Sequence, residues 1–382
     1  MKLFPLKHNI EQRKRSALMS RQIAKPLVLV AVMSLLAGCT TVGYYSQIVS
    51  GHMRIVMGKR PLAEIVSDES INDSVKRRLD LAQRARLFGI EQLNLPDNES
   101  YTSFYDTGQE YVTWNVIAAE EFSLNPYTWC FPIAGCVAYR GYYAEEDAKA
   151  YAEGLAKEGF DVTVTGATAY STLGWFEDPL LNTMLERSDP SIASLLFHEL
   201  AHQQLYVGDD STFNESFASF VEEEGLRLWQ ENEERLYPEI DQSAMARELD
   251  ARKQRQDDFI ALLTDTRDDL AEIYESESTP EVMRQKKKQR FEQMLVEYEA
   301  LKESWGGYHG YDQWFSQDLN NARLVAVATY NDYIPAFEVL FKESGSSFEQ
   351  FYVAALELSK LPLEERTLKM QDLLAKSSVT SQ

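Results

Sequence analysis

The spacing of apolar and polar positions predicts a chain in which helices outnumber strands. Residues 70–88 place apolar side chains near one helical stripe: Ile71, Val75, Leu79, Ala82 and Leu87. Residues 144–157 predict a further helix. Residues 111–118, rich in Val, Ile, Trp and Tyr, and residues 160–165, which alternate after a glycine, predict strands. We therefore expect an α+β fold that is predominantly helical, with a small sheet beside the helices.

Two later segments predict a charged helical hairpin. Residues 246–275 and 280–302 are rich in charge and have a helical period. An apolar seam runs along them through Phe259, Leu263, Leu270 and Ile273. Thr279 and Pro280 mark the start of the second helix. The hairpin, inserted at about residues 246–302, could cover a cleft or offer a surface to a protein partner. We favour simple packing on the body, because charge-rich helices usually present a solvated face.

Residues 189–205 predict the helix that carries the most informative motif. Asp189 can cap this helix and Pro190 suits its first position. Four leucines give it an apolar surface to bury: Leu195, Leu196, Leu200 and Leu205.

His198 and His202 lie four residues apart on this helix. Such a pair projects from one face with Cβ atoms about 5–6 Å apart, which suits one shared cation. Glu199, beside the first histidine, can act as the base for a water that the metal activates. The motif therefore predicts one Zn²⁺ ion and peptide hydrolysis.

A catalytic zinc takes three protein ligands, so the sequence must offer a third. Glu215 is one candidate, but Thr212 stands before it in capping-box spacing, and a glutamate there often only satisfies the start of its own helix. Glu222, two turns along the same face, is a second candidate. Asn214 could orient a ligand.

The amino terminus predicts export and a lipid anchor. A basic stretch precedes an apolar run at residues 26–36, and Leu36-Ala37-Gly38-Cys39 follows. This matches a bacterial lipoprotein signal over residues 1–38, with Cys39 left to carry acyl chains such as palmitate; the apolar run is too short for a membrane span. Met19 is an alternative start to Met1. Thr40 after the cysteine favours the outer membrane, facing the periplasm.

Charge and cysteine content agree with an exported body on a tether. Residues 39–382 carry 31 basic and 59 acidic side chains, a formal charge of −28. This balance argues against nucleic acid and against electrostatic binding to anionic lipid. Cys130 and Cys136 can form a disulfide in an oxidising periplasm. Metal binding is the alternative, although two cysteines without partner ligands make a poor zinc site.

The sequence His-Glu-Leu-Ala-His-Gln followed by Phe-Asn-Glu-Ser-Phe-Ala resembles gluzincin metallopeptidases of the alanyl-aminopeptidase type. Their glutamate ligand lies in Asn-Glu-Gly-Phe-Ala, so the resemblance implies that Glu215 is the third ligand. Ser216 replaces the glycine, and the spacer after His202 is several residues shorter, which a shorter loop would explain. Glu222 remains the second candidate.

Further stretches resemble a bacterial family of predicted aminopeptidase lipoproteins: residues 128–136, 139–142, 169–176 and 320–324. The resemblance covers most of the mature chain. It implies a gluzincin-like zinc peptidase domain at residues 67–375, after a lipidated tether and early helix at residues 39–66. It also implies removal of amino-terminal residues. A metalloendopeptidase and a non-catalytic periplasmic zinc-binding scaffold are the alternatives.

The segment before the zinc helix is placed to bind substrate. Residues 170–179 are expected to form an edge strand that pairs with the peptide backbone. The alanyl-aminopeptidase type carries Gly-Ala-Met-Glu-Asn there for the substrate's α-amine, and this stretch is absent. Glu177 or Asp178 could substitute, or could be solvated turn acids.

Peptide hydrolysis also needs a donor for the developing oxyanion. Tyr330, Tyr333 and His309 are candidates. The chain has 20 tyrosines, and most tyrosines are packing residues with a bonded hydroxyl.

Overall fold

The structure, a computed structural model, describes residues 42–131, 135–236 and 242–380. The described residues divide into two units, the first ending at Arg54 and the second beginning at Ile55. In the first unit, residues 42–54 are helical. The expected signal peptide at residues 1–38 and the lipidation site Cys39 lie outside the described residues. No helix in the described ranges is both long and apolar enough to cross a membrane.

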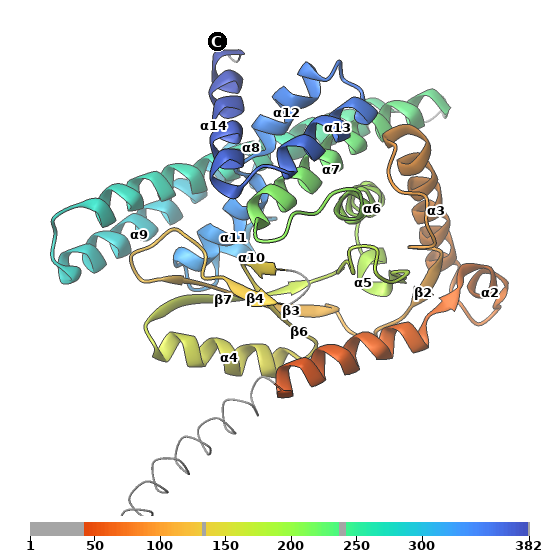
Figure 1. The fold of residues 1–382 in the computed structure, drawn as a ribbon, viewed down its shortest axis with the longest axis horizontal. Helices are drawn as coiled ribbons and strands as arrows, with labels where there is room; N and C mark the ends of the chain where they lie inside the picture. Colours follow the sequence, from red (N-terminus) through yellow and green to blue (C-terminus); the bar gives the residue numbers. More distant parts are fainter. Residues whose placement is uncertain (1–41, 132–134, 237–241, 381–382) are drawn as a thin grey trace, which may run out of the picture. The chain divides into compact units, whose positions relative to one another are not determined.

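The second unit is α+β and mostly helical, as predicted (Figure 1). Its helices are α2 (Leu62–Ser67), α3 (Asp73–Leu93), α4 (Glu145–Lys157), α5 (Asn182–Leu185), α6 (Asp189–Gln204), α7 (Ser211–Leu236), α8 (Gln242–Glu275), α9 (Pro280–Ser304), α10 (Asp312–Phe315), α11 (Asn321–Asn331), α12 (Ile334–Glu343), α13 (Phe348–Ser359) and α14 (Leu363–Thr380). Its strands are β1 (Arg60–Pro61), β2 (Ser103–Tyr105), β3 (Thr113–Glu120), β4 (Trp129–Phe131), β5 (Gly135–Val137), β6 (Arg140–Tyr142), β7 (Phe160–Ala167) and β8 (Leu180–Leu181).

The described strands form two small sheets and one hairpin. The larger sheet has the order β6-β3-β7, and β3 pairs antiparallel with both neighbours. Helix α4 covers one face of this sheet and α11 the other (Figure 1). The second sheet, β1-β2-β8, pairs β2 parallel to β8, while β4 and β5 pair only with each other. The sequence predicted β3, β7 and α4 to within a few residues.

The main core surrounds α6 and α7. Phe197 of α6 and Phe213 and Phe217 of α7 are fully buried, and Phe337 of α12 packs against both α7 rings. Helix α3 packs on α6, and Leu79 and Ala82 of the predicted stripe are buried. Ile71 of that stripe lies before the helix begins, and Leu87 is 49% exposed. Leu87 follows Leu79 by eight residues, which places it about 80° around the helix and off the buried face.

Residues 170–179 do not form the expected edge strand. The backbone N–H and hydroxyl of Thr172 both donate to the carboxylate of Asp178, at 2.9 and 2.8 Å. Leu173 and Gly174 take left-handed φ values of 55° and 78°. These side-chain bonds close the segment into a compact loop, because they satisfy backbone groups that a strand would offer to a neighbour. Only Leu180–Leu181 form a strand, β8.

The predicted charged hairpin is confirmed as α8 and α9, with Thr279 capping α9. It has its own apolar core, separate from the main one, to which both helices, α10 and α11 contribute: Phe259, Leu262, Leu263, Leu270, Phe291, Met294, Tyr298, Phe315 and Leu324. Ile273 of the predicted seam is partly buried against this core. The two helices of the hairpin therefore bury much of their apolar surface against each other.

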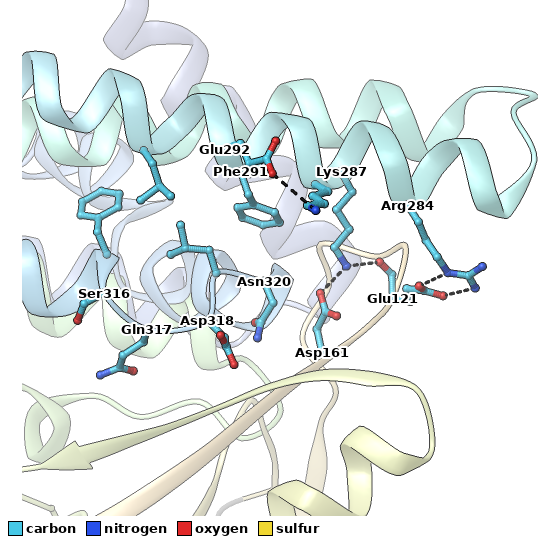
Figure 2. A pocket seen from close by; sticks show the side chains of 14 residues that line it. Glu121, Asp161, Arg284, Lys287, Phe291, Glu292, Ser316, Gln317, Asp318 and Asn320 are labelled. Carbon is cyan, nitrogen blue, oxygen red and sulfur yellow. Dashed lines mark hydrogen bonds and ion pairs between the residues drawn. The ribbon is translucent and has the colours of Figure 1, made fainter.

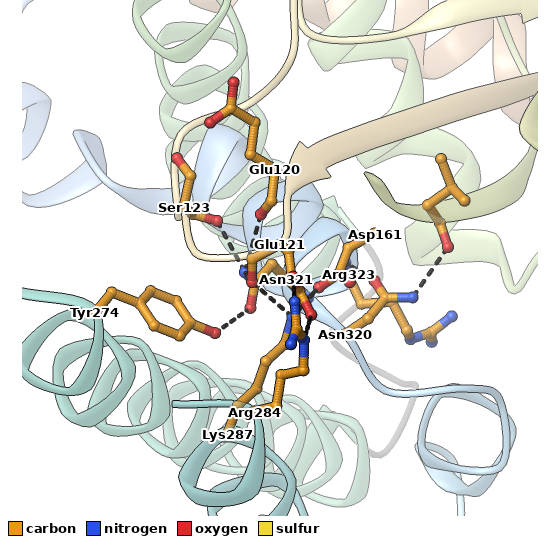
Figure 3. A network of polar contacts seen from close by, with 11 residues as sticks. Glu120, Glu121, Ser123, Asp161, Tyr274, Arg284, Lys287, Asn320, Asn321 and Arg323 are labelled. Atoms are coloured by element: carbon orange, nitrogen blue, oxygen red, sulfur yellow. Dashed lines mark hydrogen bonds and ion pairs between the residues drawn. The ribbon is translucent and has the colours of Figure 1, made fainter. Parts of the chain in front are cut away.

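A polar network fastens the hairpin to the sheet. The amide of Asn321 donates to the carbonyls of Glu120, Glu121 and Ser123, and its oxygen accepts the hydroxyl of Tyr274 of α8 (Figure 3).

Two ion pairs from α9 reach the same part of the sheet. Lys287 contacts Asp161 at 2.6 Å, and Arg284 contacts Glu121 at 2.5 Å, at one end of an open hollow of about 540 Å³ (Figure 2). The hairpin packs on the body, as favoured from sequence, and the ion pairs of Arg284 and Lys287 supply part of the contact.

Replacing Asn321 should destabilise the fold strongly. Asn321→Ala leaves buried carbonyls without their donor, and we expect a loss of about 3 kcal/mol in the free energy of unfolding, measured with urea. Asn331→Ala is the matched control on the same helix, because its amide donates only to Val327 within α11. A loss at Asn321 no larger than that at Asn331 would contradict the role of this network.

Candidate metal site

Helix α6 brings the two histidines of the motif together. His198 and His202 are each 8% exposed, and their rings meet edge to face with centroids 4.8 Å apart. Their Nε2 atoms lie 3.1 Å apart. The helix begins one residue earlier than predicted: Ser188 occupies the capping position and Asp189 is the first helical residue.

Helix α7 supplies the third member of the group. Asp210 caps this helix, since its Oδ1 accepts the N–H of Phe213 at 3.0 Å. Glu215 is therefore free of the capping role that its spacing from Thr212 suggested. Its Oε2 lies 3.4 Å from Nε2 of His198 and 3.3 Å from Nε2 of His202.

The three buried side chains fit a zinc ion. Within the described part of the chain, His198, His202 and Glu215 are the group of metal-binding type whose donor atoms all lie within 4.8 Å of one another. Their separations of 3.1, 3.3 and 3.4 Å are close to the edge of a tetrahedron with metal bonds of about 2.0–2.1 Å, which is about 3.3–3.4 Å. Two imidazole nitrogens and one carboxylate leave a fourth position for water or substrate.

Glu222 lies on the other side of the His198 ring. Its Oε2 is 3.0 Å from Nδ1 of His198, whereas the atom that meets Glu215 is Nε2. Glu222 thus lies outside the three-atom group and holds the ring from behind, as carboxylates commonly do for metal-binding histidines. Nδ1 of His202 is buried and has no hydrogen-bond partner among the described residues.

The side-chain hydrogen bonds of Asn214 go to the loop before α7, although the sequence suggested that this amide could orient a ligand. Its side-chain oxygen accepts the N–H of Val207 at 2.8 Å, and its NH₂ group donates to the carbonyl of Val207 at 2.7 Å. Both ends of the amide therefore hold the loop between α6 and α7.

Burial and mutual attraction set the charges of the group. Burial raises the pKa of Glu199, against the attraction of His198 and His202. Burial also acts to raise the pKa of Glu215, but the two histidines bring that pKa down to about 2. For His198, burial acts to lower the pKa, and the hydrogen-bonded carboxylates of Glu215 and Glu222 overcome it and raise the pKa well above its ordinary value. Three carboxylates around two imidazoles favour a cation.

Tyr330 is the predicted oxyanion donor that the structure brings to the group. It lies on α11, is 37% exposed, and its ring stacks on that of His198 with centroids 6.2 Å apart. The negative charge of Glu215 raises the pKa of Tyr330 well above its ordinary value. Its hydroxyl therefore stays protonated and able to donate.

The sequence did not single out Tyr206, which is also close to Glu215. Burial, and then Glu215 and Asp209, raise the pKa of Tyr206 to about 12. It lies in the loop after α6, and the one available signal was its position four residues beyond His202.

The other two predicted donors make their contacts elsewhere. The backbone N–H of Tyr333 donates to the hydroxyl of Ser216, and its ring packs against the main core. His309 is exposed beside Tyr308, after the end of α9. The structure joins neither of them to the metal group.

The two candidate amine-binding acids differ sharply. Glu177 is 62% exposed at its side chain and pairs with Lys59 at 3.2 Å, as a solvated turn acid would. Asp178 is 2% exposed, and Thr172 donates to both of its oxygens. Burial raises the pKa of Asp178 to about 6, opposed by Thr172, and the charge of Glu199 adds to the rise. Asp178 is thus within electrostatic reach of Glu199.

The predicted disulfide between Cys130 and Cys136 is present and joins β4 to β5. A metal role for these two cysteines is excluded while their sulfurs are bonded to each other.

Comparison with known proteins identifies the family. The family described as "Putative aminopeptidase" matches residues 43–370. The chain belongs to this family. The match covers α6, α7, α11 and the disulfide hairpin, and so includes every residue of the metal group. No curated protein and no solved structure matches the chain.

The buried carboxyl of Asp178 should make stability depend on pH. Its folded-state pKa of about 6 lies above the value of 3.8 for an unfolded aspartate. The folded chain therefore binds the proton more tightly, and stability is lost as the pH rises through 6. The side chain of Asp178→Asn cannot ionise. Between about pH 4 and about pH 7, the free energy of unfolding of this variant should therefore rise relative to that of the parent by up to about 3 kcal/mol. Urea unfolding of both proteins measures this, and a difference that is constant with pH would contradict it.

Proposed function

We propose that this protein is a gluzincin-type zinc peptidase that removes amino-terminal residues from peptides. The observation that carries the proposal is the buried triangle of His198, His202 and Glu215, with Glu199 beside the first histidine. Two further observations support it. The chain belongs to the family described as "Putative aminopeptidase", and Glu215 lies on α7 within Phe-Asn-Glu-Ser-Phe-Ala, as the gluzincin resemblance implies.

The residues around the triangle have defined tasks in this proposal. Zn²⁺ bound there would polarise the scissile carbonyl and make water more acidic. Glu199 takes a proton from the water while the water oxygen attacks the carbonyl carbon. It then gives that proton to the amine nitrogen as the C–N bond breaks. The raised pKa of the buried Glu199 suits a group that must hold that proton between the two steps. The hydroxyl of Tyr330 donates to the developing oxyanion.

The preference for a free amino terminus rests on the family and on Asp178. This acid is within electrostatic reach of Glu199 and could attract a substrate ammonium group. Its bonds to Thr172 also give it a structural role, so a metalloendopeptidase is the second candidate. A zinc-binding scaffold without activity is the third.

We also propose that acylated Cys39 tethers the protein to the bacterial outer membrane, where the rest of the chain faces the periplasm. The support is the sequence Leu36-Ala37-Gly38-Cys39 after a basic and an apolar stretch. The disulfide fits this location, because disulfides persist in oxidising compartments.

Replacing Glu199 should separate metal binding from catalysis. Glu199→Gln keeps the three ligands, so zinc content should stay at the parent level while peptide hydrolysis falls by about 10²–10⁴-fold. Metal analysis and a panel of peptides with free and acetylated amino termini measure both effects. Removing the metal from the parent with a chelator should abolish hydrolysis, and added Zn²⁺ should restore it.

Three results would each remove part of this proposal. Parent-rate cleavage by Glu199→Gln would remove the general base. Equal cleavage of acetylated peptides would favour the endopeptidase, and bound zinc without any cleavage would favour the scaffold.

Glu222 should matter for zinc affinity although it lies outside the triangle. Glu222→Ala frees the ring of His198, and we expect zinc affinity to fall by about 10–100-fold in competition with a chromophoric chelator. Glu223→Ala is the matched control, because the adjacent carboxylate accepts a hydrogen bond from Gln256 of α8 instead. Similar affinities for the two variants would contradict a role for Glu222 in holding His198.

A further inference from the structure

The loop at residues 205–210 fixes how the metal group assembles. It joins α6, which carries both histidines, to α7, which carries Glu215. A displacement of this loop changes where Glu215 meets the two histidines. Asn214 holds its first half through Val207, and Arg366 holds its end through a buried ion pair with Asp210 at 2.7 Å.

The hairpin formed by β4 and β5 holds the same loop at a third point. The N–H of Cys136 donates to Oδ1 of Asp209 at 2.6 Å, and the N–H of Ala138 donates to the hydroxyl of Ser211 at 3.2 Å. Gly135 packs directly on Asp209: a Cβ there would lie 2.7 Å from Oδ1 and 2.9 Å from the backbone nitrogen. The residue that donates to Asp209 is thus itself one half of the disulfide.

The other strand of the hairpin is fixed to the sheet layer. Nε1 of Trp129 donates to the hydroxyl of Tyr151 on α4 at 2.9 Å. The Trp129 ring also meets that of Tyr127, with centroids 4.9 Å apart, and the N–H of Tyr127 bonds to Ala118 of β3. The hairpin therefore links the α4 and β3 layer to the loop between the two ligand helices.

We propose that this disulfide-closed hairpin braces the metal site, with Asp209 as the positioning residue, so that zinc affinity depends on the Cys130–Cys136 bond. The inference rests on the proposed function only in taking zinc as the metal. Breaking the bond takes two electrons and two protons from an added dithiol, which is itself oxidised to a disulfide, and leaves the two cysteines as thiols.

The physical reason is a loss of pre-organisation. Without the bond, only backbone pairing holds β5 to β4, and the hairpin gains conformations. The N–H of Cys136 is then no longer fixed opposite Asp209. A freer loop lets the separation of the histidines and Glu215 vary, and a less pre-organised set of ligands binds metal more weakly.

The test measures zinc affinity of the full chain by competition with a chromophoric chelator. We expect the double variant Cys130→Ser, Cys136→Ser and the variant Asp209→Ala each to lose about tenfold in affinity. Asp209→Asn should stay within about twofold, because asparagine keeps the acceptor oxygen and tolerates the left-handed φ of 69° at this position. Asp68→Ala is the control, since that carboxylate accepts Ser70 in an exposed turn.

Parent affinity in the folded cysteine variant would overturn the proposal, and so would equal losses in Asp209→Asn and Asp209→Ala. If the cysteine variant fails to fold, the two Asp209 variants decide the question. The outcome is separable from the fate of the proposed function. If zinc affinity falls in these variants but the protein has no peptidase activity, the role of the hairpin stands and the proposed function is wrong. If the protein is an active peptidase but its zinc affinity is unchanged in these variants, the proposed function stands and the role of the hairpin is wrong.

Discussion

The burial of two carboxylates and two imidazoles between α6 and α7, with the half-buried carboxylate of Glu222 beside them, is the constraint on which the structure depends. Charges removed from water are costly unless they are paired, and Glu199, Glu215 and Glu222 surround only two histidines. A divalent cation bound by His198, His202 and Glu215 would balance the excess. The surrounding fold keeps these groups in position: phenylalanines pack behind both helices, Glu222 orients one ring, and the loop between the helices is held from several sides.

The molecule separates the region that holds the metal group from the charge-rich hairpin of α8 and α9. The main core encloses α6 and α7, whereas the α8 and α9 hairpin has a core of its own. Asn321 and the ion pairs of α9 join the two regions near the sheet. Helix α11 begins in that network and carries Tyr330 near its other end. The same helix therefore binds the hairpin and positions the Tyr330 ring beside His198.

Several of the longer helices and the two longest strands followed from the sequence, and the local predictions that failed share a cause. The period of apolar residues predicted α3, α4, α8 and α9, because a helix or strand buries one face. Residues 170–179 were predicted wrongly because Thr172 and Asp178 bond to nearby backbone and close a loop. Asp210, rather than Thr212, caps α7, and the amide of Asn214 bonds to Val207. Short polar side chains choose among several local partners, and periodicity does not record that choice.

The sequence by itself determined which residues could form the group, and the tertiary structure decided which of them meet. His198, Glu199 and His202 lie on one helix, whose geometry fixes their relation whatever the rest of the chain does. Glu215 and Glu222 lie on the next helix, and only the packing of α7 on α6 places the first beside both Nε2 atoms and the second behind His198. Likewise, Tyr330 stacks on that ring because α11 packs against α7 as well as against the sheet. Contacts between elements depend on loop length and core packing, which no local pattern encodes.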